Sequence, residues 1–445
     1  MIKKRLLKNI ILLAYPLIME NLLQVSMGLV DNYFVSRLGT ESIVGVGITN
    51  QIMNIHMSFF FAVGVGTTAL VSRHLGAVEN ENASESAQQA FLLSFILGLT
   101  IGVINLVFYK QILMLLGLNS SLLNVASPYF LVVAGPSMLL SMSIMISSSL
   151  RGAKDTKSTM KIAIVSNLVN IILDPILIFG IFNIPGMGIV GAGIATSFSR
   201  MIGVILLIRK TSSVNSKIRI KYRNIFKFDK TIMKNITKIG IPVATERLFM
   251  RIGQLIYNGY IISLGSKVYA AYVITGTLDS FAYIPGIAIG GAAAALVGTS
   301  LGASEKEEAY RYGMGSLFLG TIFMIIIGLI NCIFASAIAD VFTKDAAVKA
   351  NIIYILRIMI LLEPFSAITL IITPALQGAG DTKLPMIYTL VGIWVFRVFG
   401  CYLFVHRMGY GISTVIFTVF LDLFLRSILL LVRFRTKKWQ YIKVY

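Results

Sequence analysis

The sequence is short of charge and nearly without cysteine. Of its 445 residues, 13% are charged and 56% are hydrophobic, whereas soluble proteins average about 25% charged and about 45–50% apolar residues. This shortage of charge excludes an ordinary soluble domain and indicates a chain that faces lipid. The two cysteines, Cys332 and Cys401, lie inside apolar runs without metal-ligand spacing, so we interpret both as packing residues.

Catalytic motifs are missing as well. We find no Gly-x-Ser-x-Gly, no His-Glu-x-x-His and no paired-histidine spacing, and no repeated selectivity loop of the kind that channels carry. We therefore expect neither an enzyme nor a cofactor. A net charge of +20 would suggest a nucleic-acid partner in a soluble protein, but here the basic residues lie between apolar runs, so we expect the lipid bilayer as partner and no nucleic acid.

Long apolar runs are what the sequence does contain. A membrane-spanning helix needs about 20 largely apolar residues, and such segments recur along the whole chain. We therefore predict an all-α membrane protein with twelve transmembrane helices. The predicted spans are residues 10–35, 45–71, 88–109, 122–148, 161–183, 188–208, 236–263, 268–297, 313–335, 350–375, 385–405 and 411–432.

The positions of lysine and arginine predict the orientation. Most of the 39 such residues fall at the two termini and in the even-numbered loops, ten of them between Arg209 and Lys238. Because cytoplasmic loops are enriched in lysine and arginine, we expect a multi-pass protein of the inner (plasma) membrane with both termini in the cytoplasm.

One segment of the sequence occurs twice. Leu-Arg-Gly-Ala-Lys-Asp-Thr-Lys at 150–157 returns as Leu-Gln-Gly-Ala-Gly-Asp-Thr-Lys at 376–383. The offset of 226 residues also pairs Pro16 with Pro242 and Glu20 with Glu246. An offset that persists along the halves indicates a duplication. The duplication suggests that a single chain is the working unit, so we expect a monomer.

The duplication predicts the domain organisation. We expect a six-helix amino-terminal lobe (1–208), a basic cytoplasmic linker (209–235) and a six-helix carboxy-terminal lobe with a basic tail (236–445). An even number of spans per lobe makes both lobes enter the membrane in the same direction, so a pseudo-two-fold axis along the membrane normal should relate them. The linker alternates charge with apolar residues, and it either lies on the anionic inner leaflet or is a solvated loop.

Ionisable residues inside the first six predicted spans mark a candidate site, because a charge at mid-bilayer costs about 2.5–3.5 kcal/mol on insertion scales. Asp31 and Asp174 are such residues, and Asn170 shares a helix face with Asp174 at i, i+4. Pro175 removes a backbone donor and frees carbonyl oxygens near this carboxylate, which suits a hard cation such as Na⁺. Thr196 of the next span is able to add a hydroxyl.

Further polar residues are candidates for a substrate cavity or a second cation site: Glu20, Gln24, Asn50, Glu246 and Asp279. Glu246 lies beside Arg247, so a structural ion pair is the alternative for it. Asp279 either meets a cationic substrate or neutralises an arginine. Glu363 precedes Pro364, where we expect the helix to kink.

These residues resemble the multidrug and toxic compound extrusion (MATE) family. The first span, from Pro16 through Asp31 to Leu38-Gly39, is similar to the family's first-helix pattern. The two Leu-x-Gly-Ala-x-Asp-Thr-Lys segments resemble its cytoplasmic signature after the fourth and tenth spans.

The resemblance implies two six-helix bundles that open alternately and export amphiphilic, often cationic, compounds by Na⁺ or H⁺ antiport. It places the coupling-cation site at Asp31, Asn170, Asp174 and Thr196, and the seventh-span glutamate at Glu246. We expect bending near Pro16 and Pro175. One departure is Ser366, which stands where some members carry a tenth-span aspartate. The alternative function is a lipid-linked oligosaccharide flippase of the same superfamily, which generally needs a strongly cationic cavity, whereas the first-half charges here are acidic.

Overall fold

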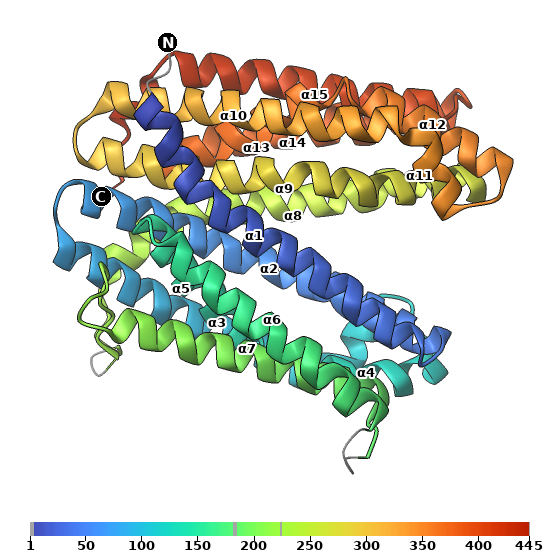
Figure 1. Cartoon of the computed structure of the whole chain (residues 1–445), viewed down its shortest axis with the longest axis horizontal. Helices are drawn as coiled ribbons and strands as arrows, with labels where there is room; N and C mark the ends of the chain where they lie inside the picture. Colours follow the sequence, from blue (N-terminus) through green and yellow to red (C-terminus); the bar gives the residue numbers. More distant parts are fainter. Residues whose placement is uncertain (1–3, 181–184, 223–224, 445) are drawn as a thin grey trace. The chain divides into compact units, whose positions relative to one another are not determined.

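The computed structural model describes residues 4–180, 185–222 and 225–444. Within these ranges the regular structure is entirely helical and no strand occurs. Figure 1 shows the path of the chain. The elements are α1 (Lys4–Ser36), α2 (Thr40–Gly76), α3 (Asn80–Leu115), α4 (Ser120–Ala134), α5 (Ser137–Gly152), α6 (Thr156–Phe179), α7 (Gly188–Ser212), α8 (Lys230–Ser263), α9 (Ser266–Gly302), α10 (Lys306–Ile333), α11 (Ala335–Phe342), α12 (Ala346–Met359), α13 (Glu363–Gly378), α14 (Lys383–Val391), the π-helical η2 (Gly392–Phe399) and η3 (Tyr402–Arg407), α15 (Ile412–Arg435) and the short η4 (Lys438–Tyr441).

The helices account for the predicted membrane spans. Among the described residues, nine helices are long and apolar enough to cross a membrane, or eleven when the bent pairs α4–α5 and α12–α13 each count as one span. The remaining predicted span is α8, which is long but carries Glu246, Arg247 and Arg251. The last predicted residues of the fifth span, 181–183, lie outside the described residues.

The helices pack into two compact units. The amino-terminal unit contains Met19–Gly240, and the carboxy-terminal unit contains Ile241–Val444 together with the chain up to Ile18. Helices α1 and α8 therefore each contribute to both units, and each passes from one unit to the other two residues from a proline, Pro16 or Pro242. The sequence boundaries of the two predicted lobes stay a prediction, because packing groups the residues differently at these two helices.

The first half of α1 is part of the core of the carboxy-terminal unit. Ile10 and Leu17 are buried there in an apolar cluster with residues of α9, α10, α13 and α15. These last four helices run side by side in Figure 1. The Asn9 amide adds a hydrogen bond of 2.9 Å to the Tyr312 hydroxyl. This burial explains why one face of the first half of α1 is apolar although its first turns also carry basic residues.

Glycines allow close helix contacts in both halves. A side chain at Gly64 of α2 would lie 2.5 Å from Ser148 Oγ on α5. Its repeat mate Gly290 of α9 lies even closer to α13, where a Cβ would be 2.2 Å from the Leu370 carbonyl oxygen. A side chain at Gly290 would displace the backbone of the neighbouring helix, whereas one at Gly64 would first displace the Ser148 hydroxyl.

The repeated segments fold into the same turn. In both, the amide of the aspartate donates to the carbonyl of the leucine five residues earlier, at 2.8 Å for Asp155 and 2.9 Å for Asp381. The residue before the aspartate is left-handed, with φ of 60° at Lys154 and 88° at Gly380. This arrangement ends α5 and α13 as a Schellman-type cap. The duplication therefore extends from sequence to backbone geometry, and other left-handed positions recur at the same offset: Gly39 with Gly265, and Val78 with Ser304.

Replacing Gly380 by alanine is expected to destabilise the protein by about 1–2 kcal/mol, because a left-handed backbone strains a side chain. The new Cβ would also lie 2.6 Å from Val444 Cγ2. Lys154→Gly is the matched control, since it changes the equivalent turn to the unstrained residue and should leave stability the same or slightly raised. Thermal unfolding in detergent compares the two variants. Equal melting temperatures would contradict this account.

Both repeated aspartates bind a basic residue near the end of another helix of their own unit. Asp155 lies 3.1 Å from Lys210 Nζ at the end of α7, and Asp381 accepts from Arg433 Nε of α15 at 2.6 Å. Partial burial tends to raise the pKa of Asp155, but hydrogen bonds from Ser158 and Lys210 outweigh burial and hold its pKa below the ordinary value. The contact therefore adds stability above the pKa of an unfolded aspartate and loses it only as strong acid protonates the folded carboxylate.

The linker packs against its own unit where it is described. Ile218 and Ile220 are fully buried. Lys217, which precedes them, and Arg219, which lies between them, are exposed. The Ile220 amide donates to the Thr211 carbonyl at 3.0 Å. Burial of the isoleucines accounts for the alternating pattern. Whether the exposed basic face lies on the inner leaflet stays a prediction, and residues 223–224 of the linker lie outside the described residues.

Candidate functional site

The amino-terminal unit contains a polar cavity of about 470 Å³. Side chains of α1, α2, α4, α5, α6 and α7 line it, so every span of this unit except α3 contributes. Because these helices surround one cavity, residues far apart in sequence gather here. Five of the predicted site residues line the cavity: Glu20, Gln24, Asp31, Asn50 and Thr196.

Two predicted carboxyl groups meet at the edge of this cavity. The side chains of Asp31 on α1 and Asp174 on α6 interact with each other. The Asn170 amide, one turn before Asp174, donates to Asp174 Oδ1 at 3.4 Å. Asp174 and Asn170 are almost completely buried. Because an ionised carboxylate only accepts hydrogen bonds, contact between two carboxyl groups requires a proton or a cation between them.

Three acceptor oxygens of this group have no donor. No described residue donates a hydrogen bond to Asp31 Oδ1, Asn170 Oδ1 or Asp174 Oδ2, although all three atoms are buried. Buried polar atoms are normally satisfied, and exceptions point to a missing partner. A proton or a hard cation is the partner that several converging oxygens accept. The predicted coupling residues Asp31, Asn170 and Asp174 therefore form one cluster.

The other predicted residues of this site are Thr196 and the two hinge prolines. The Thr196 hydroxyl lines the cavity, but it donates to the Ala192 carbonyl of its own helix at 2.9 Å. Its oxygen keeps a lone pair for a cation. Pro16 lies inside α1 and Pro175 inside α6, and bending at either residue stays a prediction.

Arg200 and Tyr129 are site residues that the sequence analysis missed. Both line the cavity. Arg200 interacts electrostatically with Asp31, and Tyr129 interacts with Asp31, Asp174 and Arg200. The signal for Arg200 was present, because it follows Thr196 by four residues and so shares its helix face. Tyr129 carried no such signal, since tyrosines are common in membrane helices.

The repeat mates Glu20 and Glu246 make equivalent contacts in their own units. Glu20 accepts from Arg151 at 3.4 Å and from Thr159 at 3.0 Å. Glu246 accepts from Gln377, the repeat mate of Arg151, at 3.2 Å, and from Thr389 at 2.8 Å. Each glutamate thus binds the second residue of the repeated segment. Glu20 lines the cavity and forms an ion pair with Arg151, whereas the side chain of Glu246 is buried.

The other predicted residue of the second half, Asp279, lies on α9 in the carboxy-terminal unit. It interacts electrostatically with Tyr283, one turn along α9, with Glu363 on α13 and with Arg397. Arg251, by contrast, is exposed and donates to Gln254 at 3.1 Å. Among residues 4–180, 185–222 and 225–444, no group of three or more His, Cys, Asp or Glu side chains is placed to hold a metal ion.

These features define a class of protein. Up to eleven candidate spanning helices within the described part of the chain, with a carboxylate-bearing cavity in one unit, are typical of a multi-pass membrane transporter. The MatE family model matches residues 16–176 and again residues 242–403. The chain therefore belongs to the MatE family of MATE transporters, and it is not an enzyme. The two matches begin 226 residues apart, which is the offset of the repeated segments.

Relatives of this family align with most of the chain. YisQ of Bacillus subtilis, named an uncharacterized transporter, is 29% identical over 96% of this chain and 94% of its own length. NorM of Thermotoga maritima, named a probable multidrug resistance protein, is 28% identical over 97% and 93%. A protein of Shewanella oneidensis named FAD transporter is 27% identical over 73% and 72%.

Solved structures share the fold. A MATE structure in complex with MaD3S has a TM-score of 0.90 at 24% identity and covers 97% of this chain and 96% of its own. An outward-facing multidrug resistance MATE transporter has a TM-score of 0.89 at 24% identity, with 97% of both chains covered. The predicted fold, a helical transporter of the MATE type, is thereby confirmed.

Proposed function

We propose that this protein is a secondary active efflux transporter that exports amphiphilic, mainly cationic organic compounds in exchange for H⁺ or Na⁺. The observation that carries the proposal is the cluster of Asp31, Asn170 and Asp174, whose buried oxygens lack donors beside an open cavity. In this proposal the cluster binds the coupling ion.

The charge balance in the cavity explains how a cationic substrate exchanges for the coupling ion. Arg151 is paired with Glu20, and Arg200 faces Asp31. With one proton on the Asp31–Asp174 pair, these five groups sum to neutrality. Loss of that proton leaves a net negative charge, which attracts a cationic substrate. Return of a proton or Na⁺ removes the attraction, so the two ligands favour different states of the transporter, as antiport requires.

The same charges argue against the flippase alternative and against an anionic substrate such as FAD. Both arginines that line the cavity already face a carboxylate, so neither is available to pair with a phosphate. We further propose that the protein works as a monomer in the plasma membrane with both termini in the cytoplasm. The concentration of basic residues at the termini and even-numbered loops supports that orientation.

Asp31→Asn is expected to lower gradient-driven efflux by about tenfold or more, because coupling free energies between ligands are typically about 1–3 kcal/mol. Asparagine keeps the size of the side chain but has no negative charge with which to bind a proton or Na⁺. The measurement is efflux of a cationic dye from proteoliposomes, with pH and Na⁺ gradients imposed separately to identify the coupling ion. Glu41→Gln, which changes an exposed carboxylate of the same unit, should transport like wild type.

Two results would contradict the proposal. Full efflux by a correctly inserted Asp31→Asn variant would remove the coupling role of this cluster. Transport of FAD, but of no cationic dye, by the wild-type protein under any gradient would instead establish an anionic substrate. FAD loading of the same vesicles is therefore the second arm of the assay.

A further inference from the structure

The linker between α7 and α8 is fixed to helix α3 at several points. The Arg219 amide donates to Ser84 Oγ at 3.1 Å. The ring of Tyr222 packs edge-on against Phe91, with 5.2 Å between the ring centroids. Further along the linker, the side chain of Gln89 on α3 binds its backbone. The described part of the linker is therefore a fixed surface of the amino-terminal unit and not a free tether.

Gln89 holds the end of the linker in place. Its Nε2 donates to the Lys227 carbonyl at 2.6 Å, and its Oε1 accepts from the Asp229 amide at 3.1 Å. The side chain of Gln89 is itself 2% exposed, so the two bonds tie this backbone to the interior of the unit. Phe228 lies between the two bound backbone groups, and its position is fixed by them.

Two phenylalanines at this end of the linker are open to the surroundings. Phe226 is 78% exposed and Phe228 is 65% exposed, although phenylalanine is among the residues most often buried. They alternate with the exposed Lys227, whose long side chain is able to lie along apolar groups while its charge reaches polar ones. An exposed aromatic pair on a fixed backbone is an apolar contact surface.

These phenylalanines lie close to the level at which the chain enters the membrane. Gln89 is the second residue of the predicted third span, 88–109, so the linker groups that it binds are at the edge of the bilayer. Lys230 begins α8 and lies six residues before the predicted seventh span, which is about 9 Å along a helix. Aromatic side chains at this depth are stable between the headgroups and the acyl chains.

The exposed side chains around the aromatic pair are basic. Asp229 is the only acidic residue in the stretch 209–235, and its carboxylate caps α8 by accepting from the amides of Thr231 at 2.8 Å and Ile232 at 3.0 Å. The exposed basic residues of the described linker from residue 217 onward are Lys217, Arg219, Lys221, Lys227 and Lys230. Such a cluster favours an anionic lipid surface as its partner.

We propose that these five basic residues bind the phosphate headgroups of anionic lipids, while the rings of Phe226 and Phe228 enter the acyl boundary of the same leaflet. In the proposed orientation this is the inner leaflet. The surface attaches the linker to the bilayer directly before α8 begins. A soluble acidic protein is the competing partner, but its binding would not account for the depth at which Gln89 holds the rings.

Fluorescence quenching by brominated lipids tests the depth of the linker. A bimane label, itself aromatic, is attached to Phe228→Cys in full-length protein that also carries Cys332→Ser, because Cys401 is completely buried and needs no replacement. In vesicles of equal amounts of phosphatidylcholine and phosphatidylglycerol, bromines near the headgroup should quench the label more strongly than bromines near the chain ends. Glu81→Cys, exposed on α3 seven residues before the predicted span, is the matched control, and its label should not be quenched.

The choice of lipid is tested in the same vesicles by placing bromine on only one of the two lipids. Phosphatidylglycerol should be in about fivefold local excess at the label, because each lysine or arginine near an anionic surface contributes about that factor. Raising the salt from about 0.1 M to about 1 M shortens the Debye length from about 10 Å to about 3 Å and should remove most of the excess. Combining Lys217→Gln, Arg219→Gln and Lys221→Gln should also lower it. Lys344→Gln, at an exposed lysine outside the linker, should not.

Two results would overturn the proposal. If no brominated lipid quenches the label at position 228, the rings lie outside the bilayer and the surface fits a soluble partner instead. If the two lipids quench equally at low salt, the partner is not an anionic lipid. Phe226→Cys repeats both measurements at the second ring, so a Phe228→Cys protein that fails to fold does not end the test. None of these readouts involves transport, and failure of the proposed export would leave them unchanged.

Discussion

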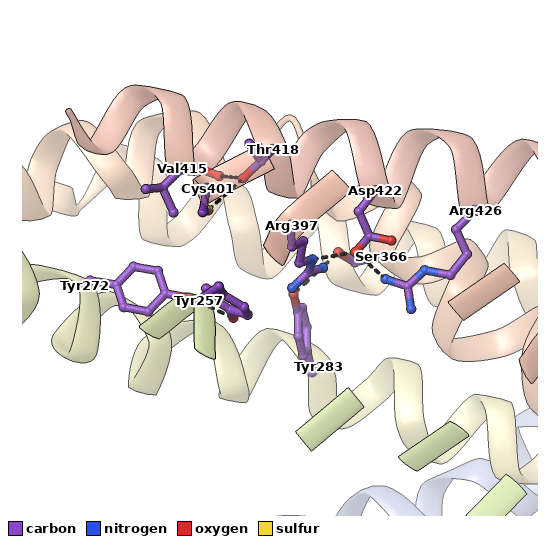
Figure 2. Close-up of polar contacts among 10 residues, drawn as sticks. All are labelled: Tyr257, Tyr272, Tyr283, Ser366, Arg397, Cys401, Val415, Thr418, Asp422 and Arg426. Atoms are coloured by element: carbon purple, nitrogen blue, oxygen red, sulfur yellow. Dashed lines mark hydrogen bonds and ion pairs between the residues drawn. The ribbon is translucent and has the colours of Figure 1, made fainter. Parts of the chain in front are cut away.

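Asp422→Asn is expected to destabilise the protein by about 3–5 kcal/mol, which is the cost of removing one partner of a buried ion pair. Asp422 is completely buried on α15, and both Arg397 and Arg426 bind its Oδ2 atom (Figure 2). Asparagine would leave two guanidinium groups in the interior of the unit without their shared carboxylate. We expect a much lower melting temperature in detergent and a smaller yield of folded protein.

Arg426→Gln is the informative comparison. It removes one of two positive charges and leaves the Arg397–Asp422 pair intact, so the loss of stability should be clearly smaller than for Asp422→Asn. Asp340→Asn, which breaks an exposed ion pair with Lys349, should change the stability by no more than about 1 kcal/mol. If Arg426→Gln were as damaging as Asp422→Asn, shared compensation by Asp422 would be the wrong explanation.

The space for this group is built into the backbone. A Cβ at Gly392, in η2, would lie 2.0 Å from Asp422 Oδ1. The surrounding backbone is π-helical from Gly392 to Phe399 and again from Tyr402 to Arg407. Such wide turns often occur at functional sites. Here the first of them carries Arg397, which binds Asp422 and interacts with Asp279.

The sequence predicted which residues carry charge in the membrane better than it predicted their partners. The i, i+4 spacing of Asn170 and Asp174 gave their contact directly, because helix geometry fixes it. The contact of Asp31 with Asp174 required tertiary packing of α1 on α6, and only the family resemblance suggested it. Arg397 and Asp422 are 25 residues apart on segments whose facing sides depend on π-helical turns, which no periodicity in the sequence indicates.

The duplication predicted local geometry well and packing less well. The two copies of the repeated segment adopt the same left-handed turn, because a turn depends on local backbone bonds. The division of α1 and α8 between the two packing units was not predicted, since hydropathy reports the length of a helix and not its neighbours. Glu20 and Glu246 illustrate both points, because they occupy equivalent places with different partners, an arginine in one unit and a glutamine in the other.

Gly290→Ala is expected to destabilise the protein by about 3 kcal/mol, at the upper end of the cost of overpacking a core. Its new methyl group would lie 2.2 Å from the Leu370 carbonyl oxygen and 3.2 Å from Pro374 Cγ. Both neighbours are rigid parts of α13, so α9 and α13 would have to separate. The expected result is a lower melting temperature in detergent.

The adjacent glycine provides the matched control. At Gly291 the nearest atom to a new Cβ is Leu17 Cδ1 at 3.5 Å, which is an ordinary contact. Gly291→Ala should therefore be neutral or stabilise the helix by up to about 1 kcal/mol, because alanine has the higher helix propensity. Equal effects of the two substitutions would show that a general demand for glycine in α9 governs this segment. A large difference between them would show that glycine is needed only at Gly290, where α13 approaches closely.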